Sequence, residues 1–315
     1  MSKVAFVFPG QGSQQVGMGK SLALAFPEVS KVFEQADQVL PFSLSETVFQ
    51  GPIEELTKTE YAQPGILTTS LAFLELVKKE GIIPDFAAGH SLGEYSALVA
   101  AEALNFEDAV KAVYQRGKFM NEAVPFGEGS MSAILGMEKE ALEIIMEETT
   151  AAGDSVQLAN LNCPGQIVIS GTKMGVEKAS VRAKEEGAKR IIPLVVSGPF
   201  HSSLMKPAAE QFSNVLAHIN FRDASFPVIS NVTAQPVTSC DQFSSLLEEQ
   251  LYSPVLWEDT INELVSQGVT TFVEIGPGKV LSGLIKKINR AAVTLQVHDE
   301  ASLQKTIQTL KENKS

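Results

Sequence analysis

Ser91 lies at the centre of Gly89-His90-Ser91-Leu92-Gly93, a Gly-X-Ser-X-Gly pentapeptide. In a nucleophile elbow the serine occupies a sharp turn between a strand and a helix, and small flanking glycines leave room for neighbouring backbone. The amide N–H groups that open the following helix are unpaired and point to the place where an oxyanion would form. The pentapeptide is short, so an ordinary Gly-Ser turn is the alternative interpretation.

The segments on either side of the pentapeptide favour the elbow. Residues 85–88 have the composition of a short buried strand, and residues 94–104 form a largely apolar helical run. A strand that leads directly into a helix is the context that a nucleophile elbow requires. Ser91 is therefore a candidate nucleophile.

A serine nucleophile needs a base, and histidine is the usual one because its unperturbed pKa lies close to neutral pH. His90 adjoins Ser91, but adjacent side chains on an extended segment point apart. His218 lies in a helical run, and His298 ends a short strand-like run. His201 follows a strand-like run and a turn, and such loops carry most active-site residues. Elimination favours His201, with a purely structural histidine as the alternative.

A second glycine-rich loop begins with Gly10-Gln11-Gly12 and follows the first strand-like run. It resembles half of a dinucleotide-binding fingerprint, but Gln15 replaces the third glycine and no acidic partner ends a second strand. Another interpretation is that its backbone faces the active site, where the N–H groups of Gln11 and Leu92 would form an oxyanion hole. A plain strand-to-helix turn is the third possibility.

Arg116 closes a helical run in Tyr114-Gln115-Arg116-Gly117. An arginine at this place can interact with the last carbonyl groups of its helix, which is a structural role. The sequence alone leaves that role and a functional role open.

The elements around these residues predict an α/β core, because short apolar strands that alternate with helices indicate a mostly parallel sheet covered on both faces. The strands expected are residues 4–8, 85–88, 228–229, 271–275 and 294–297, and the helices are residues 18–40, 63–79, 94–104, 208–219 and 302–311.

Residues 130–197 change character and predict a smaller unit of order β-α-β-β-α-β, the ferredoxin-like arrangement. Its strands are expected at residues 131–137, 156–162, 166–172 and 190–196, and its helices at residues 139–150 and 176–186. We therefore expect residues 1–126 and 198–315 to form a hydrolase-like catalytic core, into which residues 127–197 are inserted.

Composition excludes several classes of partner. The chain of 315 residues has 37 acidic and 25 basic residues and a net charge of −12, which argues against nucleic acid or an anionic membrane surface. Its 2 cysteines, Cys163 and Cys240, form no disulfide framework and lack metal-motif spacing, so no metal is expected and a reducing cytoplasm fits. The apolar run at residues 4–8 is too short for a signal peptide, and no later run is long enough to span a bilayer.

Six short motifs follow one another in a specific order between residues 8 and 278. They are Phe8-Pro9-Gly10-Gln11-Gly12-Ser13-Gln14, Gly89-His90-Ser91-Leu92-Gly93-Glu94-Tyr95, Gln115-Arg116-Gly117, Asn160-Leu161-Asn162-Cys163-Pro164-Gly165-Gln166, Gly198-Pro199-Phe200-His201 and Glu274-Ile275-Gly276-Pro277-Gly278. As an ordered set they make the chain resemble the malonyl-CoA:acyl carrier protein transacylases, and more broadly the acyltransferase domains of fatty-acid and polyketide synthases.

The resemblance implies a ping-pong transfer of a malonyl group from malonyl-CoA to acyl carrier protein in fatty-acid biosynthesis, with no cofactor. Ser91 would be acylated and His201 would be its base. The family has no carboxylate at the usual third position, and the backbone carbonyl of Gln250 would orient the imidazole instead. The oxyanion hole would come from Gln11 and Leu92, and the substrate-binding residues would be Arg116, which holds the malonyl carboxylate, Phe200, Asn160 and Asn162.

Three rival functions remain open. A polyketide acyltransferase shares the whole set of motifs, and a serine thioesterase shares the elbow and the histidine but has no use for a carboxylate-binding arginine. A carrier-binding module without catalysis would leave Ser91 unmodified. An acidic carrier would need a basic docking area, for which Lys189-Arg190 and Lys286-Lys287 with Arg290 are candidates, although charge runs are most often solvated faces.

Overall fold

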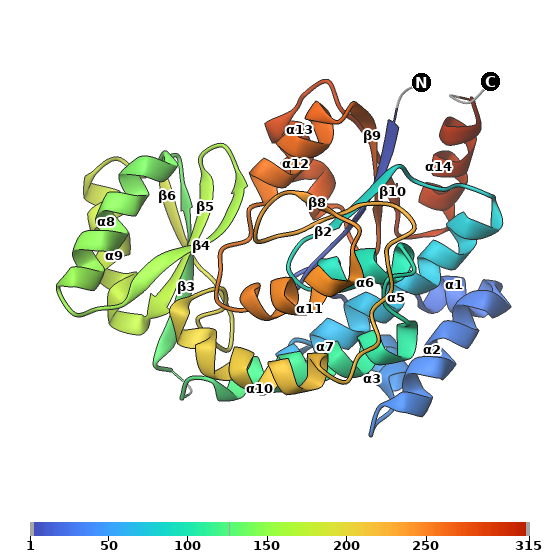
Figure 1. Cartoon of the computed structure of the whole chain (residues 1–315), viewed down its shortest axis with the longest axis horizontal. Helices are drawn as coiled ribbons and strands as arrows, with labels where there is room; N and C mark the ends of the chain where they lie inside the picture. Colours follow the sequence, from blue (N-terminus) through green and yellow to red (C-terminus); the bar gives the residue numbers. More distant parts are fainter. Residues whose placement is uncertain (1–2, 126, 313–315) are drawn as a thin grey trace.

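The computed structural model describes residues 3–125 and 127–312, and within them the strands form two sheets. The larger, six-stranded sheet has the order β10-β9-β1-β2-β7-β8, and all its neighbouring strands are parallel except the antiparallel edge strand β8 (Figure 1). Its strands are β1 (Lys3–Phe8), β2 (Phe86–Gly89), β7 (Val228–Ile229), β8 (Pro236–Val237), β9 (Val269–Ile275) and β10 (Val293–Val297).

The helices around this sheet come from the parts of the chain before and after the four-stranded sheet. They are α1 (Lys20–Ala25), α2 (Pro27–Val39), α3 (Leu44–Gln50), α4 (Ile53–Leu56), α5 (Thr59–Lys79), α6 (Gly93–Ala100), α7 (Phe106–Glu122), α10 (Lys206–Leu216), α11 (Cys240–Glu249), α12 (Trp257–Ser266), α13 (Val280–Ile288) and α14 (Glu300–Glu312), with a short 3₁₀ turn at Ser203–Met205.

Strand β1 shows why the sheet needs cover on both faces. Its side chains alternate in direction, and both sets are buried. Phe6 and Phe8 pack into a core formed with α5, α7 and α14, whereas Ala5 and Val7 pack into a second core with α12 and α13. A strand that is apolar on both faces is stable only between two layers of helices, which is the α/β arrangement expected from the sequence.

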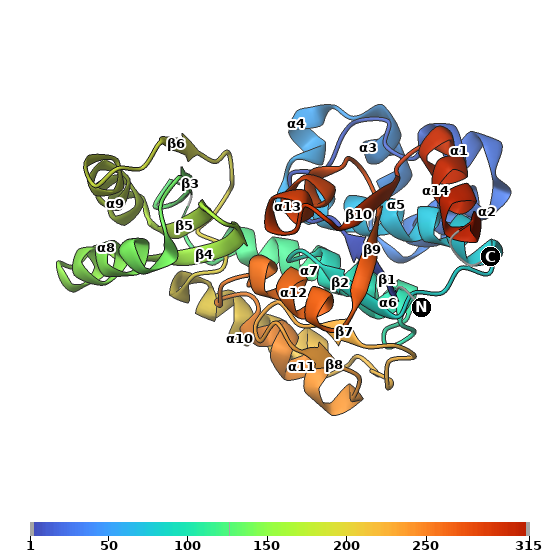
Figure 2. The same cartoon turned by 90° about the horizontal axis from the view of Figure 1, so that it is seen from above.

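The second sheet is four-stranded and antiparallel, and it forms a lobe beside the larger sheet (Figure 2). Its elements follow the chain as β3 (Gly129–Leu135), α8 (Lys139–Ala151), β4 (Val156–Cys163), β5 (Gln166–Thr172), α9 (Lys173–Glu185) and β6 (Arg190–Pro193). The strand order is β4-β5-β3-β6, and one face is covered by α8 and α9. The predicted α/β fold with a ferredoxin-like β-α-β-β-α-β unit is thus confirmed.

A short backbone joint connects the two parts of the molecule. Val255, in the segment after α11, donates its N–H to the carbonyl of Ala159 at 2.8 Å and accepts the N–H of Leu161 at 2.9 Å. Strand β4 therefore pairs on one side with β5 and on the other with a segment of the larger part. This pairing places the end of the small sheet against the segment that carries Gln250.

Three expected boundaries are wrong for identifiable reasons. The helix expected at residues 18–40 is two helices, because Phe26 is extended and Pro27 begins α2 at a position where proline is favoured. The helix expected at residues 94–104 ends at Ala100, and Glu102 adopts the left-handed conformation (φ 62°) typical of a helix end. The strand expected at residues 190–196 ends at Pro193, which has no N–H for a ladder.

Other features of the described residues bear on the expected partners. No helix in these ranges has the length and apolar composition needed to cross a bilayer. Nor do His, Cys, Asp and Glu side chains in the same ranges gather in groups of three or more that would hold a metal ion. The expected domain boundary at residue 126, and the ends at residues 1 and 315, lie outside the described residues.

Candidate active site

Ser91 occupies a tight turn between β2 and α6, and its φ of 51° lies in the left-handed region that a non-glycine residue rarely adopts. The glycines around it are required by space. A Cβ atom on Gly89 would lie 1.8 Å from the carbonyl carbon of Gly93, and one on Gly93 would lie 2.1 Å from the carbonyl oxygen of Phe8. The pentapeptide therefore folds as a strained elbow that presents the serine side chain.

The hydroxyl of Ser91 is paired with a histidine from a distant part of the chain. Ser91 Oγ lies 2.8 Å from His201 Nε2, and His201 Nδ1 lies 2.8 Å from the carbonyl oxygen of Gln250 and 3.2 Å from that of Ser253. Carbonyl oxygens only accept hydrogen bonds, so Nδ1 carries the proton and Nε2 offers its lone pair to the serine hydroxyl. Two backbone carbonyls thus hold the imidazole where a carboxylate does so in other serine enzymes.

His201 is buried, with 3% of its surface exposed, and its φ of 56° is also left-handed. Burial lowers its pKa to about 3, and the positive charge of Arg116 contributes to this shift. The imidazole is therefore neutral at physiological pH and is able to accept a proton.

Two residues whose backbone N–H groups are unpaired in the described part of the chain line the same cavity as Ser91. Gln11 and Leu92 line a cavity of about 250 Å³ together with Ser91 and His201. Within the described residues neither the N–H of Gln11 nor that of Leu92 donates to a protein acceptor. The Gln11 loop packs directly behind the elbow, because a Cβ on Gly10 would lie 2.4 Å from the His90 carbonyl oxygen. Unpaired amides beside a nucleophile are suited to stabilising an oxyanion.

Arg116 contributes a buried positive charge to this cavity. It lies in the interior of α7, which continues to Glu122, so the alternative role at a helix end is wrong. Nη1 donates to Gln63 Oε1 at 2.9 Å, and Nη2 donates to Gln250 Oε1 at 2.9 Å and to Ser91 Oγ at 3.1 Å. Only 1% of the residue is exposed, and its Nε has no acceptor within the described residues.

A second layer of polar side chains lies behind the elbow. Asn231 accepts the Ser91 N–H at 2.7 Å and donates to the Gly89 carbonyl at 2.7 Å. Gln250 donates from Nε2 to the Ser91 carbonyl at 3.1 Å and to Glu94 Oε2 at 2.6 Å. Glu94 is buried, and the burial raises its pKa to about 7.

Sequence analysis missed this layer. Gln63, Asn231 and the side chain of Gln250 carry no local signal, because a single amide in a helix or loop has many structural uses. Glu94 did carry a local signal, because it is an acidic residue in an otherwise apolar helical run. A buried carboxyl group almost always has a polar partner, so this residue pointed to a polar cluster beside Ser91.

The remaining candidates divide between the cavity and its surroundings. Phe200 and Asn160 line the cavity. Asn162 is not among the lining residues; its Oδ1 lies 2.8 Å from His90 Nε2 and so fixes the ring of His90.

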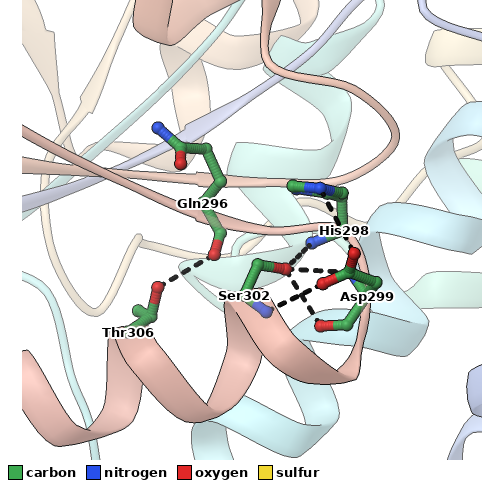
Figure 3. A network of polar contacts seen from close by, with 5 residues as sticks. All are labelled: Gln296, His298, Asp299, Ser302 and Thr306. Atoms are coloured by element: carbon green, nitrogen blue, oxygen red, sulfur yellow. Dashed lines mark hydrogen bonds and ion pairs between the residues drawn. The ribbon is translucent and has the colours of Figure 1, made fainter.

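The other two histidines lie away from the elbow. His218 is exposed after α10 and contacts the carbonyl of Asn214. His298 lies beside Asp299, just before α14, and its backbone N–H donates to the hydroxyl of Ser302 (Figure 3).

Two exposed lysines of the basic run considered for carrier docking make hydrogen bonds within the chain. Lys286 donates to the Ala292 carbonyl at 2.6 Å, and Lys287 donates to Gln166 Oε1 at 2.9 Å. These contacts give both lysines a structural role at the end of α13.

Fold and geometry together define a class: an α/β protein with a serine–histidine pair, two free amides and a buried guanidinium, suited to acyl transfer through a serine. A family model described as acyl transferase domain matches residues 5–314, and the chain belongs to this family.

Relatives and solved structures are similar over almost the whole chain. A malonyl CoA-acyl carrier protein transacylase of Bacillus subtilis (strain 168) is 61% identical over 312 residues, which cover 99% of this chain and 98% of the relative. An acyl carrier protein S-malonyltransferase of Vibrio cholerae is 45% identical with a TM-score of 0.94, covering 97% and 100% of the two chains. A malonyl-transacylase in complex with a type II PKS acyl-carrier protein is also 45% identical, with a TM-score of 0.95 and coverage of 98% and 100%.

Proposed function

We propose that this protein transfers the malonyl group of malonyl-CoA to the phosphopantetheine thiol of acyl carrier protein in fatty-acid biosynthesis, through a malonyl ester on Ser91. The observation that carries this proposal is the buried Arg116, whose Nη2 lies 3.1 Å from Ser91 Oγ. An acyl group on the serine would extend past this guanidinium, and a carboxylate at the end of the acyl group would pair with its charge. The names of the similar proteins support the same donor and acceptor.

In the first half-reaction His201 Nε2 removes the proton of the Ser91 hydroxyl while Oγ attacks the thioester carbonyl carbon. The negative charge that develops on the carbonyl oxygen is stabilised by the N–H groups of Gln11 and Leu92. The tetrahedral intermediate collapses with cleavage of the carbon–sulfur bond. The protonated His201 gives its proton to the departing coenzyme A thiolate, and a malonyl ester remains on Ser91.

The second half-reaction reverses these steps with a different thiol. His201 removes the proton of the phosphopantetheine thiol, the thiolate attacks the malonyl ester, and the proton returns to Ser91 Oγ as the ester bond breaks. Because both half-reactions use one site, coenzyme A leaves before the carrier binds, which gives ping-pong kinetics.

Arg116 provides the selectivity. Its planar guanidinium binds a carboxylate through two parallel N–H···O bonds, whereas an acetyl methyl group gains nothing from it. The aromatic ring of Phe200 and the side chains of Met120 and Met131 line the same cavity and limit the space for water beside the ester. Exclusion of water is what separates a transferase from a thioesterase with the same serine and histidine.

The organisation of the chain belongs to the same proposal. Residues 1–126 and 198–315 would form the catalytic core and residues 127–197 the insertion, since the four-stranded sheet uses only residues of the latter range. We also place the protein in the cytoplasm, which agrees with two cysteines that are both free.

The test is incubation with malonyl-CoA followed by acyl carrier protein, read by intact mass. We expect one malonyl group on the chain after the first step, and its appearance on the carrier after the second. Release as free malonate at the same rate with and without carrier would identify a thioesterase, and carrier binding without any acyl-enzyme would identify a binding module.

The polyketide pathway is the second candidate, because one similar structure contains a type II PKS acyl-carrier protein. Transfer rates to a fatty-acid carrier and to a polyketide carrier, compared at equal concentration, distinguish the two pathways.

A further inference from the structure

Glu94 is a buried carboxyl group for which the mechanism above has no use. It lies in the first turn of α6, three residues after Ser91, and 4% of its surface is exposed. Its Oε2 accepts the N–H of Asn231 at 3.1 Å and the Nε2–H of Gln250 at 2.6 Å. A buried carboxyl group that is hydrogen-bonded to Asn231 and Gln250, which both contact Ser91, is a candidate for a functional role.

One amide connects this carboxyl group to the arginine. Gln250 donates from Nε2 to Glu94 and accepts at Oε1 from Arg116, at 2.6 Å and 2.9 Å. The amide dipole therefore points its positive end at the carboxyl group and its negative end at the guanidinium. Such an arrangement stabilises both charges, because neither can be screened by water at this depth.

Gln250 also holds the other two reacting groups. Its backbone carbonyl accepts from His201 Nδ1, and its Nε2 donates to the carbonyl of Ser91. A change in the charge or position of Glu94 therefore acts through a single residue on the nucleophile, the base and the arginine.

Loading of a malonyl group changes the charge of this cluster. In the free site the positive charge of Arg116 is connected through Gln250 to the acidic side chain of Glu94. A malonyl carboxylate bound to Arg116 adds a second negative charge to this cluster. Two carboxylates sharing one buried cation are unfavourable, and the usual response in proteins is that one of them binds a proton.

We propose that Glu94 is a positioning residue that balances the charge of Arg116 and takes up a proton from solvent when a carboxylate-bearing acyl group is loaded on Ser91. The inference rests on the proposed malonyl transfer. Loading would then be linked to proton binding, and Arg116 would be released from its internal counter-charge only when the correct acyl group arrives.

The other titratable groups around Glu94 do not change protonation near neutral pH. Tyr95, whose ring lies beside Arg116, has a pKa raised by burial and stays neutral. His201 and His90 have pKa values lowered by burial, and His201 is neutral because its pKa is about 3. Glu94, with a pKa raised by burial to about 7, is the group in this cluster that is able to respond.

The first experiment counts protons during a single turnover of the wild-type protein. Malonyl-CoA or acetyl-CoA is mixed with the protein at pH 7.5 in weak buffer with an indicator dye, and acyl-enzyme is quantified by intact mass. A second negative charge near a buried carboxyl group raises the pKa of that group by roughly one to two units. We therefore expect malonyl loading to take up about half a proton more per acyl-enzyme than acetyl loading. Equal proton counts would overturn the inference.

The second experiment removes the titration while keeping the hydrogen bonds. Glu94→Gln preserves the side-chain length and an oxygen that accepts from Gln250. In the wild-type protein we expect the KM for malonyl-CoA to rise about tenfold from pH 7 to pH 9, because loading then requires proton uptake. In Glu94→Gln the KM should be flat over this range, and in the matched exposed control Glu210→Gln it should follow the wild type.

The outcomes distinguish failure of the proposed malonyl transfer from failure of the inference about Glu94. If no malonyl-enzyme forms in the wild-type protein, the proposed function is wrong. If malonyl-enzyme forms and Glu94→Gln keeps the wild-type pH profile, or loses activity equally at every pH, Glu94 has only a structural role. Should Glu94→Gln fail to fold, the wild-type comparison of malonyl with acetyl loading still decides the matter.

Discussion

The nucleophile and its base are built in opposite ways. The Ser91 elbow is local: five consecutive residues, the end of β2 and the beginning of α6 produce it, and the close contacts of Gly89 and Gly93 enforce it. The position of His201 is non-local, since it depends on carbonyls of Gln250 and Ser253, 49 and 52 residues further along the chain. The first is specified by steric constraints and the second by tertiary packing, so mutations should affect them differently.

Removing the nucleophile itself should have the largest effect. Ser91→Ala keeps the elbow, because alanine is smaller than serine and retains the backbone, but leaves no atom to be acylated. We expect malonyl transfer to fall by at least about 1,000-fold. Intact mass after incubation with malonyl-CoA should show no acylated chain, and acyl label that persists on Ser91→Ala would assign the nucleophile elsewhere.

Loss of the arginine should affect one substrate and spare another. A charge-assisted hydrogen bond contributes about 1.5–3 kcal/mol, so Arg116→Ala should lower malonyl transfer roughly 10- to 150-fold. Acetyl transfer should change little, because an acetyl group has no carboxylate. The measurement is the ratio of kcat/KM for the two acyl donors. An equal loss for both would mean that Arg116 supports the site structurally.

Removing the support behind the elbow should give a smaller, mixed effect. Asn231→Ala leaves the buried Ser91 N–H and Gly89 carbonyl without their partner, at about 1–3 kcal/mol for each unsatisfied group. We expect a lower melting temperature and about a tenfold slower reaction of Ser91 with a serine-directed phosphonyl fluoride. Unchanged reactivity with a lowered melting temperature would show that the strained turn holds without Asn231.

The smallest effect concerns the base, where we expect almost no change. Because burial and the charge of Arg116 lower the pKa of His201 to about 3, the imidazole stays neutral as the pH falls from 7 to 5. Acetyl loading in a single turnover of Glu94→Gln, in which Glu94 no longer titrates, should then vary less than about twofold over this range, whereas loading that depended on a base with the ordinary pKa of 6.5 would slow roughly 25-fold. A fall of roughly 25-fold would show that the pKa of His201 is not lowered by burial.

Local features of this molecule could be predicted from its sequence, whereas contacts between distant residues could not. The α/β core, the ferredoxin-like unit and the elbow context could be predicted, because alternation of apolar residues and glycine spacing are local signals. His201 was reached only by elimination among four histidines. Asn231 could not be reached, since it contacts a turn 140 residues earlier and no pattern marks such a distance. The break at Pro27 was present in the sequence, and an apolar run on both sides concealed it.

The joint at Val255 has a consequence for protein engineering. Strand β4 and the segment after α11 share two backbone hydrogen bonds, and that segment begins with the carbonyls that hold the His201 ring. Exchanging residues 127–197 for the corresponding unit of a relative would therefore replace one half of this joint. A chimera that keeps every catalytic side chain but mismatches the joint would misalign its own base. A successful exchange must therefore replace β4 and the segment at Val255 together.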